Sequence, residues 1–305
     1  MRRAAATLLL AACGCAVSRG DPAPGPTLPS SEPAGWLEGR PVTYDEIARH
    51  LRSKDPDLFA RTLEGVLLER LARSEATRLG VTVPAALLAR ETTRRLREWE
   101  VRLQEAARRE TGRGTDSALW LRTVAGLGPE EFRALVRRHT EVEMLQDRLL
   151  RRELLVSERA EVSLLVVEGE AKAKEVDSLL AGGEEFGALA RRHSTHATAA
   201  AGGRLEFPLL REDLGDEGLA RRLFLARPGQ WLAPAMSRAG ESGAFAFYRL
   251  EAIHPPVAGA PDAIAAAVER DLEARPVPVG EYERWRRRVF LRHGFLAAPP
   301  PRENP

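Results

Sequence analysis

Cysteine is nearly absent from the sequence. The chain of 305 residues contains only two cysteines, Cys13 and Cys15, and both stand close to the N-terminus. The rest of the chain therefore has no disulfide bond and no thiolate ligand for a metal ion. His193 and His196 have no third ligand nearby, and no HExxH motif accompanies them, so the sequence predicts neither a metal nor a cofactor.

An excess of charge of one sign is also lacking. The chain has 46 Lys and Arg against 44 Asp and Glu, and the basic residues are interspersed with acidic ones. Proteins that bind nucleic acid usually carry a clustered basic surface, so nucleic acid is not an expected partner. The composition, with 44% hydrophobic and 30% charged residues, is that of a globular protein, and the length favours two domains.

The N-terminal residues have the pattern of a secretory signal. Two arginines precede an apolar run at 4–12 that is too short to span a bilayer as a permanent helix. The letters LAAC at 10–13 resemble a bacterial lipobox, which predicts a signal peptide at 1–12 and lipidation of Cys13. The alternative is an ordinary signal peptide with two incidental cysteines. Residues 13–34, rich in proline and glycine, are predicted to form a flexible tether.

Residues 35–157 are predicted to form a helical domain. Thr43 with Glu46 has the spacing of a capping box and predicts the start of a helix. Gly80 is a plausible end for the next helix, and Pro129 followed by two glutamates predicts the first turn of a long one.

The pattern changes near residue 158. The run VSLLVV at 162–167 predicts a buried strand, and AFAFYRLEAI at 244–253 predicts another, with short helices between them. We therefore expect an α+β domain with a small antiparallel sheet at 158–256. Residues 257–297 are predicted to return to helix, and 298–305 to be a disordered tail.

The order of these elements resembles the parvulin, or PpiC-type, peptidyl-prolyl isomerases. Phe186, Ala190 and Ser194 match the family pattern F..lA..yS, and a Gly-Gly turn follows in GGRLEF. The segment LFLARPGQWLAPAMS at 223–237 matches the pattern aF.l..G..s.Pv. Helices on both sides of this domain resemble the SurA and PrsA foldases, in which the N-terminal and C-terminal segments combine into one chaperone domain.

The resemblance implies an apolar pocket that holds the proline ring of a substrate. By position, the side chains expected to line it are those of Leu214, Leu219, Phe224 and Met236. The alternative for each of them is ordinary core packing between a helix and a sheet. No cofactor is implied, because rotation about an amide bond needs none.

Two histidines that the family places in the centre of the site are missing. Ser163 on the first strand and Ala246 on the last are the residues expected in their positions, so activity is expected to be reduced or lost. His196 in the loop STHATAAAGG is expected to face the reaction centre, and with Ser163 it is the candidate catalytic group. The alternative for His196 is a solvated loop residue.

The expected function is that of an envelope protein-folding factor, a prolyl isomerase with chaperone activity on exported proteins that contain X-Pro bonds. The alternative is an inactive parvulin fold that binds clients as a holdase. The expected location is the periplasmic face of the outer membrane, with contact to the membrane through the lipid anchor only. Four tryptophans, Trp36, Trp99, Trp120 and Trp285, are candidates for an apolar client groove or for the core.

Overall fold

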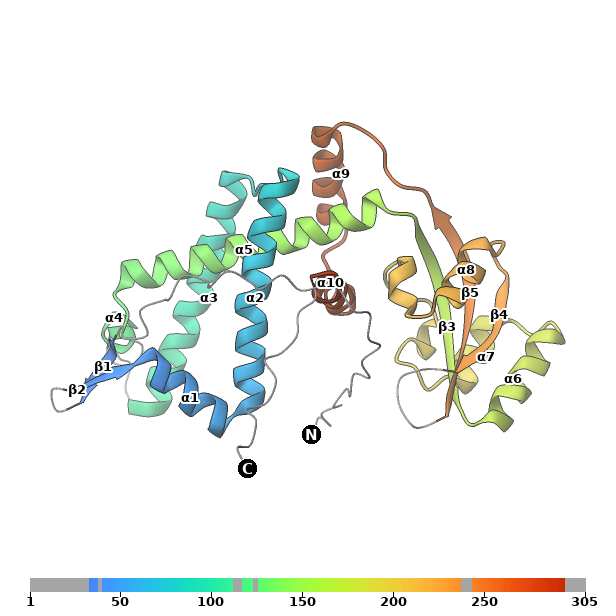
Figure 1. The fold of residues 1–305 in the computed structure, drawn as a ribbon, viewed down its shortest axis with the longest axis horizontal. Helices are drawn as coiled ribbons and strands as arrows, with labels where there is room; N and C mark the ends of the chain where they lie inside the picture. Colours follow the sequence, from blue (N-terminus) through green and yellow to red (C-terminus); the bar gives the residue numbers. More distant parts are fainter. Residues whose placement is uncertain (1–32, 38–39, 112–116, 123–125, 237–242, 294–305) are drawn as a thin grey trace, which may run out of the picture. The chain divides into compact units, whose positions relative to one another are not determined.

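The computed structural model describes residues 33–37, 40–111, 117–122, 126–236 and 243–293 (Figure 1). These residues belong to two compact units that divide between Val66 and Leu67. The predicted signal peptide, the lipidation site at Cys13 and the predicted tail at 298–305 lie outside the described residues. Within the described residues, no helix is long and apolar enough to cross a membrane.

The first unit begins with a β-hairpin and a helix. Strands β1 (Pro33–Leu37) and β2 (Arg40–Thr43) pair antiparallel, a hairpin that the sequence did not predict. Helix α1 (Tyr44–Lys54) starts where the capping box predicted. The Thr43 backbone amide donates to the Glu46 carboxylate at 2.8 Å, and the Glu46 amide donates to the Thr43 hydroxyl at 3.2 Å. Helix α2 (Pro56–Leu79) starts in this unit and continues into the second.

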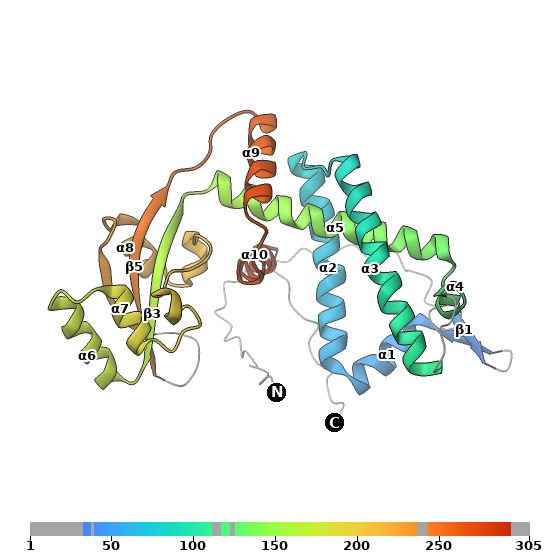
Figure 2. The same ribbon diagram turned by 180° about the vertical axis from the view of Figure 1, so that it is seen from behind.

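The helical part of the second unit is built from both ends of its sequence (Figures 1 and 2). After α2 come α3 (Ala85–Thr111), α4 (Ser117–Trp120) and the long α5 (Pro129–Val156), and after the sheet come α9 (Pro261–Ala274) and α10 (Val279–Arg292). Helix α9 packs along α5 although more than a hundred residues separate them in sequence. The core that α2, α5 and α10 share consists of Leu68, Ala72, Ala76, Leu145, Leu149, Leu150, Trp285 and Val289.

Buried ion pairs join the last two helices to α5. The Arg151 side chain is 0% exposed, and its Nη1 donates to Glu281 Oε1 at 2.6 Å. Its Nε lies 3.0 Å from Asp271 Oδ2, and its Nη2 donates to the backbone carbonyl of Arg275 at 3.0 Å. Burial lowers the pKa of Arg151 and raises that of Glu281, because each charge has left water for the interior.

The α+β part has a three-stranded antiparallel sheet in the order β3-β5-β4, which confirms the predicted fold class. Its strands are β3 (Arg159–Glu168), β4 (Trp231–Met236) and β5 (Ala244–His254). Between β3 and β4 stand α6 (Glu170–Ala181), α7 (Phe186–His193), the short helices η2 (Ala199–Ala201) and η3 (Arg211–Leu214), and α8 (Glu217–Leu225).

Each face of the sheet has its own apolar core. One face packs against α6 and α7 through Leu165, Val167, Val176, Leu180, Phe186, Leu189 and Phe247. The other packs against α8 through Val162, Leu209, Leu219, Leu223, Phe224, Leu232 and Leu250. Because both faces are covered, β3 is apolar without alternation at 164–167, unlike a half-exposed strand.

Candidate functional site

The loop after α7 is fixed along the outer edge of β3. The Thr195 amide donates to the Val166 carbonyl at 2.8 Å, and the Val166 amide donates to the Ser194 hydroxyl at 3.1 Å. Further along, the Leu164 amide donates to the Gly203 carbonyl at 2.8 Å. These bonds give the loop a defined path past the sheet, so its side chains have defined positions.

Gly203 allows this close approach to the strand. Its φ is +82°, in the left-handed region that glycine adopts without a steric cost. A Cβ atom at this position would stand 2.5 Å from the Leu164 carbonyl oxygen. Backbone atoms on both sides of that contact belong to regular hydrogen bonding, so neither can move away easily. The Gly-Gly turn of the sequence pattern is thus a point of contact between loop and strand.

His196 is half-buried in this loop, and its ring is oriented by Thr198. The Thr198 hydroxyl lies 2.8 Å from Nδ1, and the Thr198 backbone amide donates to the same nitrogen at 3.3 Å. Burial lowers the pKa of His196, and the positive charge of Arg284 lowers it further, so the ring is neutral at pH 7. A neutral ring that accepts at Nδ1 carries its proton on Nε2, which is then a hydrogen-bond donor.

The strand register separates Ser163 from Ala246. Ser163 pairs with Arg249, whereas Ala246 pairs with Val166, three residues further along β3. Side chains alternate along a strand, so an odd separation puts Ser163 and Val166 on opposite faces. The Ser163 side chain is buried, and its hydroxyl donates to Glu251, which also accepts from Arg249 at 2.8 Å.

Val166, the partner of Ala246, and Leu164 are β3 residues on the same sheet face as Ala246. Leu164 pairs with Tyr248, and Tyr248 packs against the apolar cluster under α8. This face therefore carries Leu164 and Val166, whereas Ser163 lies on the opposite face. The period-two alternation of strands was the signal that could have found Leu164, but an apolar run such as VSLLVV does not show which residues share a face.

The predicted pocket residues differ in accessibility. Leu219 and Phe224 are 5% and 6% exposed and belong to the core cluster under α8, while Leu214 is half-buried at its margin. Met236 is in β4, and its side chain lies outside the described residues. Two half-buried aromatic residues that the sequence analysis did not single out, Phe207 and Tyr248, also pack against this cluster. The margin of this cluster therefore combines aromatic and aliphatic side chains.

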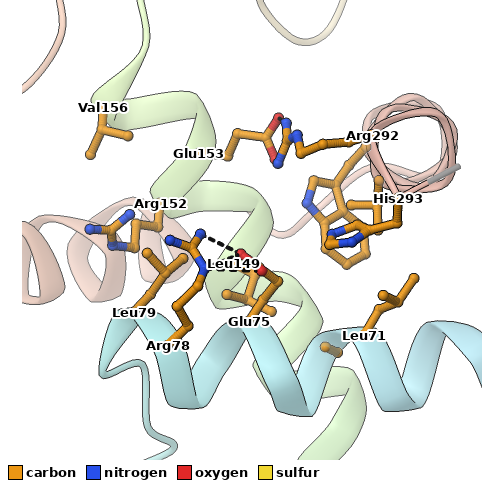
Figure 3. Close-up of a pocket in the computed structure, with 13 residues that line it drawn as sticks. Leu71, Glu75, Arg78, Leu79, Leu149, Arg152, Glu153, Val156, Arg292 and His293 are labelled. Atoms are coloured by element: carbon orange, nitrogen blue, oxygen red, sulfur yellow. Dashed lines mark hydrogen bonds and ion pairs between the residues drawn. The ribbon is translucent and has the colours of Figure 1, made fainter. Parts of the chain in front are cut away.

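A second site is a cavity of about 190 Å³ between α2, α5 and α10 (Figure 3). Its apolar lining includes Leu71, Ala72, Leu79, Leu149, Trp285 and Val289. Charged side chains surround it: Arg78 pairs with Glu75 at 2.6 Å, and Arg292 pairs with Glu153 at 2.9 Å. Arg152, also on the rim, forms no ion pair with any described residue. An apolar group with a carboxylate beside it suits such a cavity.

The four tryptophans have different surroundings. Trp285 is buried in the helical core and lines this cavity. Trp99 is 41% exposed, with Phe132 edge-on at 6.0 Å between ring centroids and the Arg102 guanidinium 5.4 Å above its ring. The side chains of Trp36 and Trp120 lie outside the described residues. Trp285 is thus the tryptophan that combines a core role with access from a cavity.

Comparisons with known proteins identify the α+β part. Residues 165–241 match the Rotamase family model, described as a PPIC-type PPIASE domain. The chain is similar to the crystal structure of the peptidylprolyl isomerase PrsA from Bacillus anthracis, with 14% identity, 78% of this chain and 100% of that chain covered, and a TM-score of 0.37. PrsA from Bacillus subtilis gives 18% identity, 88% and 96% coverage, and a TM-score of 0.30.

A structure of SurA-like chaperones from Campylobacter jejuni gives 13% identity, 86% and 95% coverage, and a TM-score of 0.30. No curated protein matches the chain. The family that the sequence pattern indicated is confirmed by the match of 165–241, which covers α7, the Gly-Gly turn, α8 and β4. This chain therefore contains a parvulin-type domain of the PpiC peptidyl-prolyl isomerase family at residues 165–241.

Proposed function

We propose that this protein is a prolyl cis-trans isomerase that acts on exported, partly folded proteins. The observation that carries the proposal is the match of residues 165–241 to the PPIC-type domain. The geometry supports it: Phe207 and Tyr248 pack at the edge of the apolar cluster under α8, Leu164 lies on the same sheet face as Tyr248, and His196 lies in the loop along β3. We take the domain to extend over 158–256, between helical segments at 35–157 and 257–297.

Rotation about an X-Pro bond is slow because amide resonance must be broken, which costs about 18–20 kcal/mol. A site accelerates it by binding the twisted amide more tightly than either planar form. Here the apolar face would hold the proline ring, with Leu214, Leu219, Phe224 and Met236 as its predicted contacts. The Nε2 proton of His196 would be donated to the prolyl nitrogen, whose lone pair becomes available when resonance is lost. With Ser163 bonded to Glu251, we assign it a structural role.

This mechanism makes His196 the residue to change first. We expect His196→Ala to lower kcat/KM for a short X-Pro peptide about tenfold, because one hydrogen bond made in the transition state contributes roughly 1.4 kcal/mol. Exchange NMR on the full chain measures the rate without a coupled protease. His193→Ala is the matched control, since His193 stands three residues earlier and outside the loop, and it is expected to keep the wild-type rate.

Equal rates for wild type and His196→Ala would remove His196 from the mechanism. No acceleration by the wild type would favour the second candidate function, a holdase with a parvulin fold. The observation in favour of that alternative is the pair of apolar residues, Leu164 and Ala246, on the face where the family carries histidine. The cavity between α2, α5 and α10 would then hold an apolar side chain of the client.

A charge placed in this cavity tests whether the cavity binds the client, as the holdase function requires. We expect Leu79→Asp to weaken binding of an unfolded client about tenfold, because the loss of one buried apolar contact costs roughly 1.5 kcal/mol. Suppression of client aggregation by the purified protein measures it. Leu291→Asp is the control, since Leu291 is 64% exposed on α10 and does not line the cavity. An equal effect of both variants would argue against the cavity as the client site.

For location, we propose secretion across the inner membrane and lipidation of Cys13. The lipobox-like letters LAAC support the lipid anchor, and a diacylglycerol with an additional acyl chain suffices for stable attachment. Glycine after Cys13 supports an anchor in the outer membrane. Metabolic labelling with a fatty acid tests this proposal, since Cys13→Ala should abolish incorporation of the label.

A further inference from the structure

Helix α10 comes into contact with the rim of the isomerase face. Its first turn packs on Phe207, because a Cβ atom at Gly280 would stand 2.9 Å from the Phe207 ring. One turn later, the Arg284 guanidinium lies 5.5 Å from the centroid of the same ring. A further turn on, Arg288 forms a buried ion pair with Asp213, next to Leu214 in η3. Helix α10 thus presents three successive turns to the segment that carries Phe207 and Leu214.

Arg284 differs from Arg288 in having no carboxylate partner among the described residues. Asp213 and Glu281, which line a small cavity together with Arg284, are engaged: Asp213 binds Arg288 and accepts from the Leu210 amide, and Glu281 binds Arg151 and Arg275. Within the described part of the chain, Arg284 forms no ion pair, and its contact is the face of Phe207. Stacking on an aromatic ring holds a guanidinium in place but leaves its charge and its donors available.

The charge of Arg284 reaches the residues proposed to contact the substrate. Burial lowers the pKa of His196 and the Arg284 charge lowers it further, whereas burial raises the pKa of Tyr248 and the Arg284 charge opposes that rise. An uncompensated positive charge that acts on both sides of a half-buried apolar face favours an anion there. This face therefore offers apolar contacts to a proline ring and a positive charge at its margin.

We propose that Arg284 makes this isomerase site select client segments that carry Asp or Glu within two residues of the proline. The inference rests on the proposed function, and it names the class of substrate. The carboxylate binds the guanidinium while the proline ring lies on the face that Phe207 borders. The selecting residue thus belongs to the C-terminal helical segment and not to residues 165–241, so the isolated family domain lacks it.

The test compares pairs of X-Pro peptides that differ only by Glu or Gln, placed two residues before, one before or one after the proline. For at least one placement, we expect the full chain to show a kcat/KM about fivefold higher for the Glu peptide at low ionic strength. Arg284→Gln should bring the ratio to about one, and Arg284→Lys should retain most of the preference. Arg287→Gln, an exposed arginine of the same helix, should leave the ratio unchanged.

Salt provides a second measurement, since a preference that arises from one ion pair falls as ionic strength rises.

A Glu/Gln ratio that is the same in wild type and Arg284→Gln at all three placements would overturn the inference and leave the isomerase intact. If no peptide is isomerised at all, the proposed function fails, and the ratio of peptide affinities from NMR titration decides the inference in its place. Equal affinities would then overturn it, and a Glu preference lost in Arg284→Gln would support it.

Discussion

Arg151→Ala is expected to lower the free energy of unfolding of the helical part by about 3–5 kcal/mol, because it removes the closer of the two arginine partners of the buried Glu281 carboxylate and leaves Arg275 at 3.3 Å. Arg151 is the fully buried centre of the joint between α5, α9 and α10, and it binds Glu281, Asp271 and the Arg275 carbonyl. Glu281 is itself 4% exposed, and burial already raises its pKa. Denaturant unfolding followed by tryptophan fluorescence, with Trp285 in the adjoining core, measures the loss.

The next residue is the matched control. Arg152 belongs to the same helix, is half-buried and has no ion pair with a described residue. We expect Arg152→Ala to change the free energy of unfolding by less than about 0.5–1 kcal/mol. The double variant Arg151→Met with Glu281→Gln should lose less than Arg151→Ala alone, because it removes both charges together. If Arg151→Ala and Arg152→Ala had equal effects, the ion pairs would not be what joins these helices.

Gly203→Ala is expected to destabilise the parvulin-type domain by about 3 kcal/mol or more. Two costs add up: alanine must adopt a left-handed conformation, and its Cβ clashes with the backbone. The added Cβ would meet the Leu164 carbonyl oxygen at 2.5 Å, and relief of that contact would break the bond between the Leu164 amide and the Gly203 carbonyl. The loop that holds His196 would move away from β3. The midpoint temperature of thermal unfolding and the isomerisation rate should both fall.

Gly183→Ala controls for conformation alone. Gly183 has a φ of +89°, close to that of Gly203, but nothing lies within 4 Å of an added Cβ. The expected cost is the conformational penalty of about 1–2 kcal/mol, with the isomerisation rate unchanged in the folded protein. A loss at Gly203 no larger than that at Gly183 would show that the loop can shift away from Leu164 without cost.

Local signals in the sequence were sufficient for most element boundaries. Thr43 with Glu46 predicted the start of α1, and Pro129 predicted the start of α5, since capping and the fixed φ of proline act within one helical turn. The order of strands and helices between residues 158 and 256 was sufficient to indicate the PpiC family, which the match at 165–241 confirmed. The hairpin of β1 and β2 was missed because it contains two prolines and only two short strands.

Which residues share a face was decided by the tertiary structure. VSLLVV is apolar on both sides, so the register of β3 on β5 was needed to show that Leu164 and Val166, and not Ser163, share the face of Ala246. The contacts of Arg284 with Phe207 and of Arg151 with Glu281 join residues 77 and 130 positions apart. Apart from the β1–β2 hairpin, the sequence by itself determined the elements, their order and the family, because propensity, capping and turn chemistry are local. The side chains that meet at the isomerase face come from segments far apart in the sequence, so only the folded chain decides which they are.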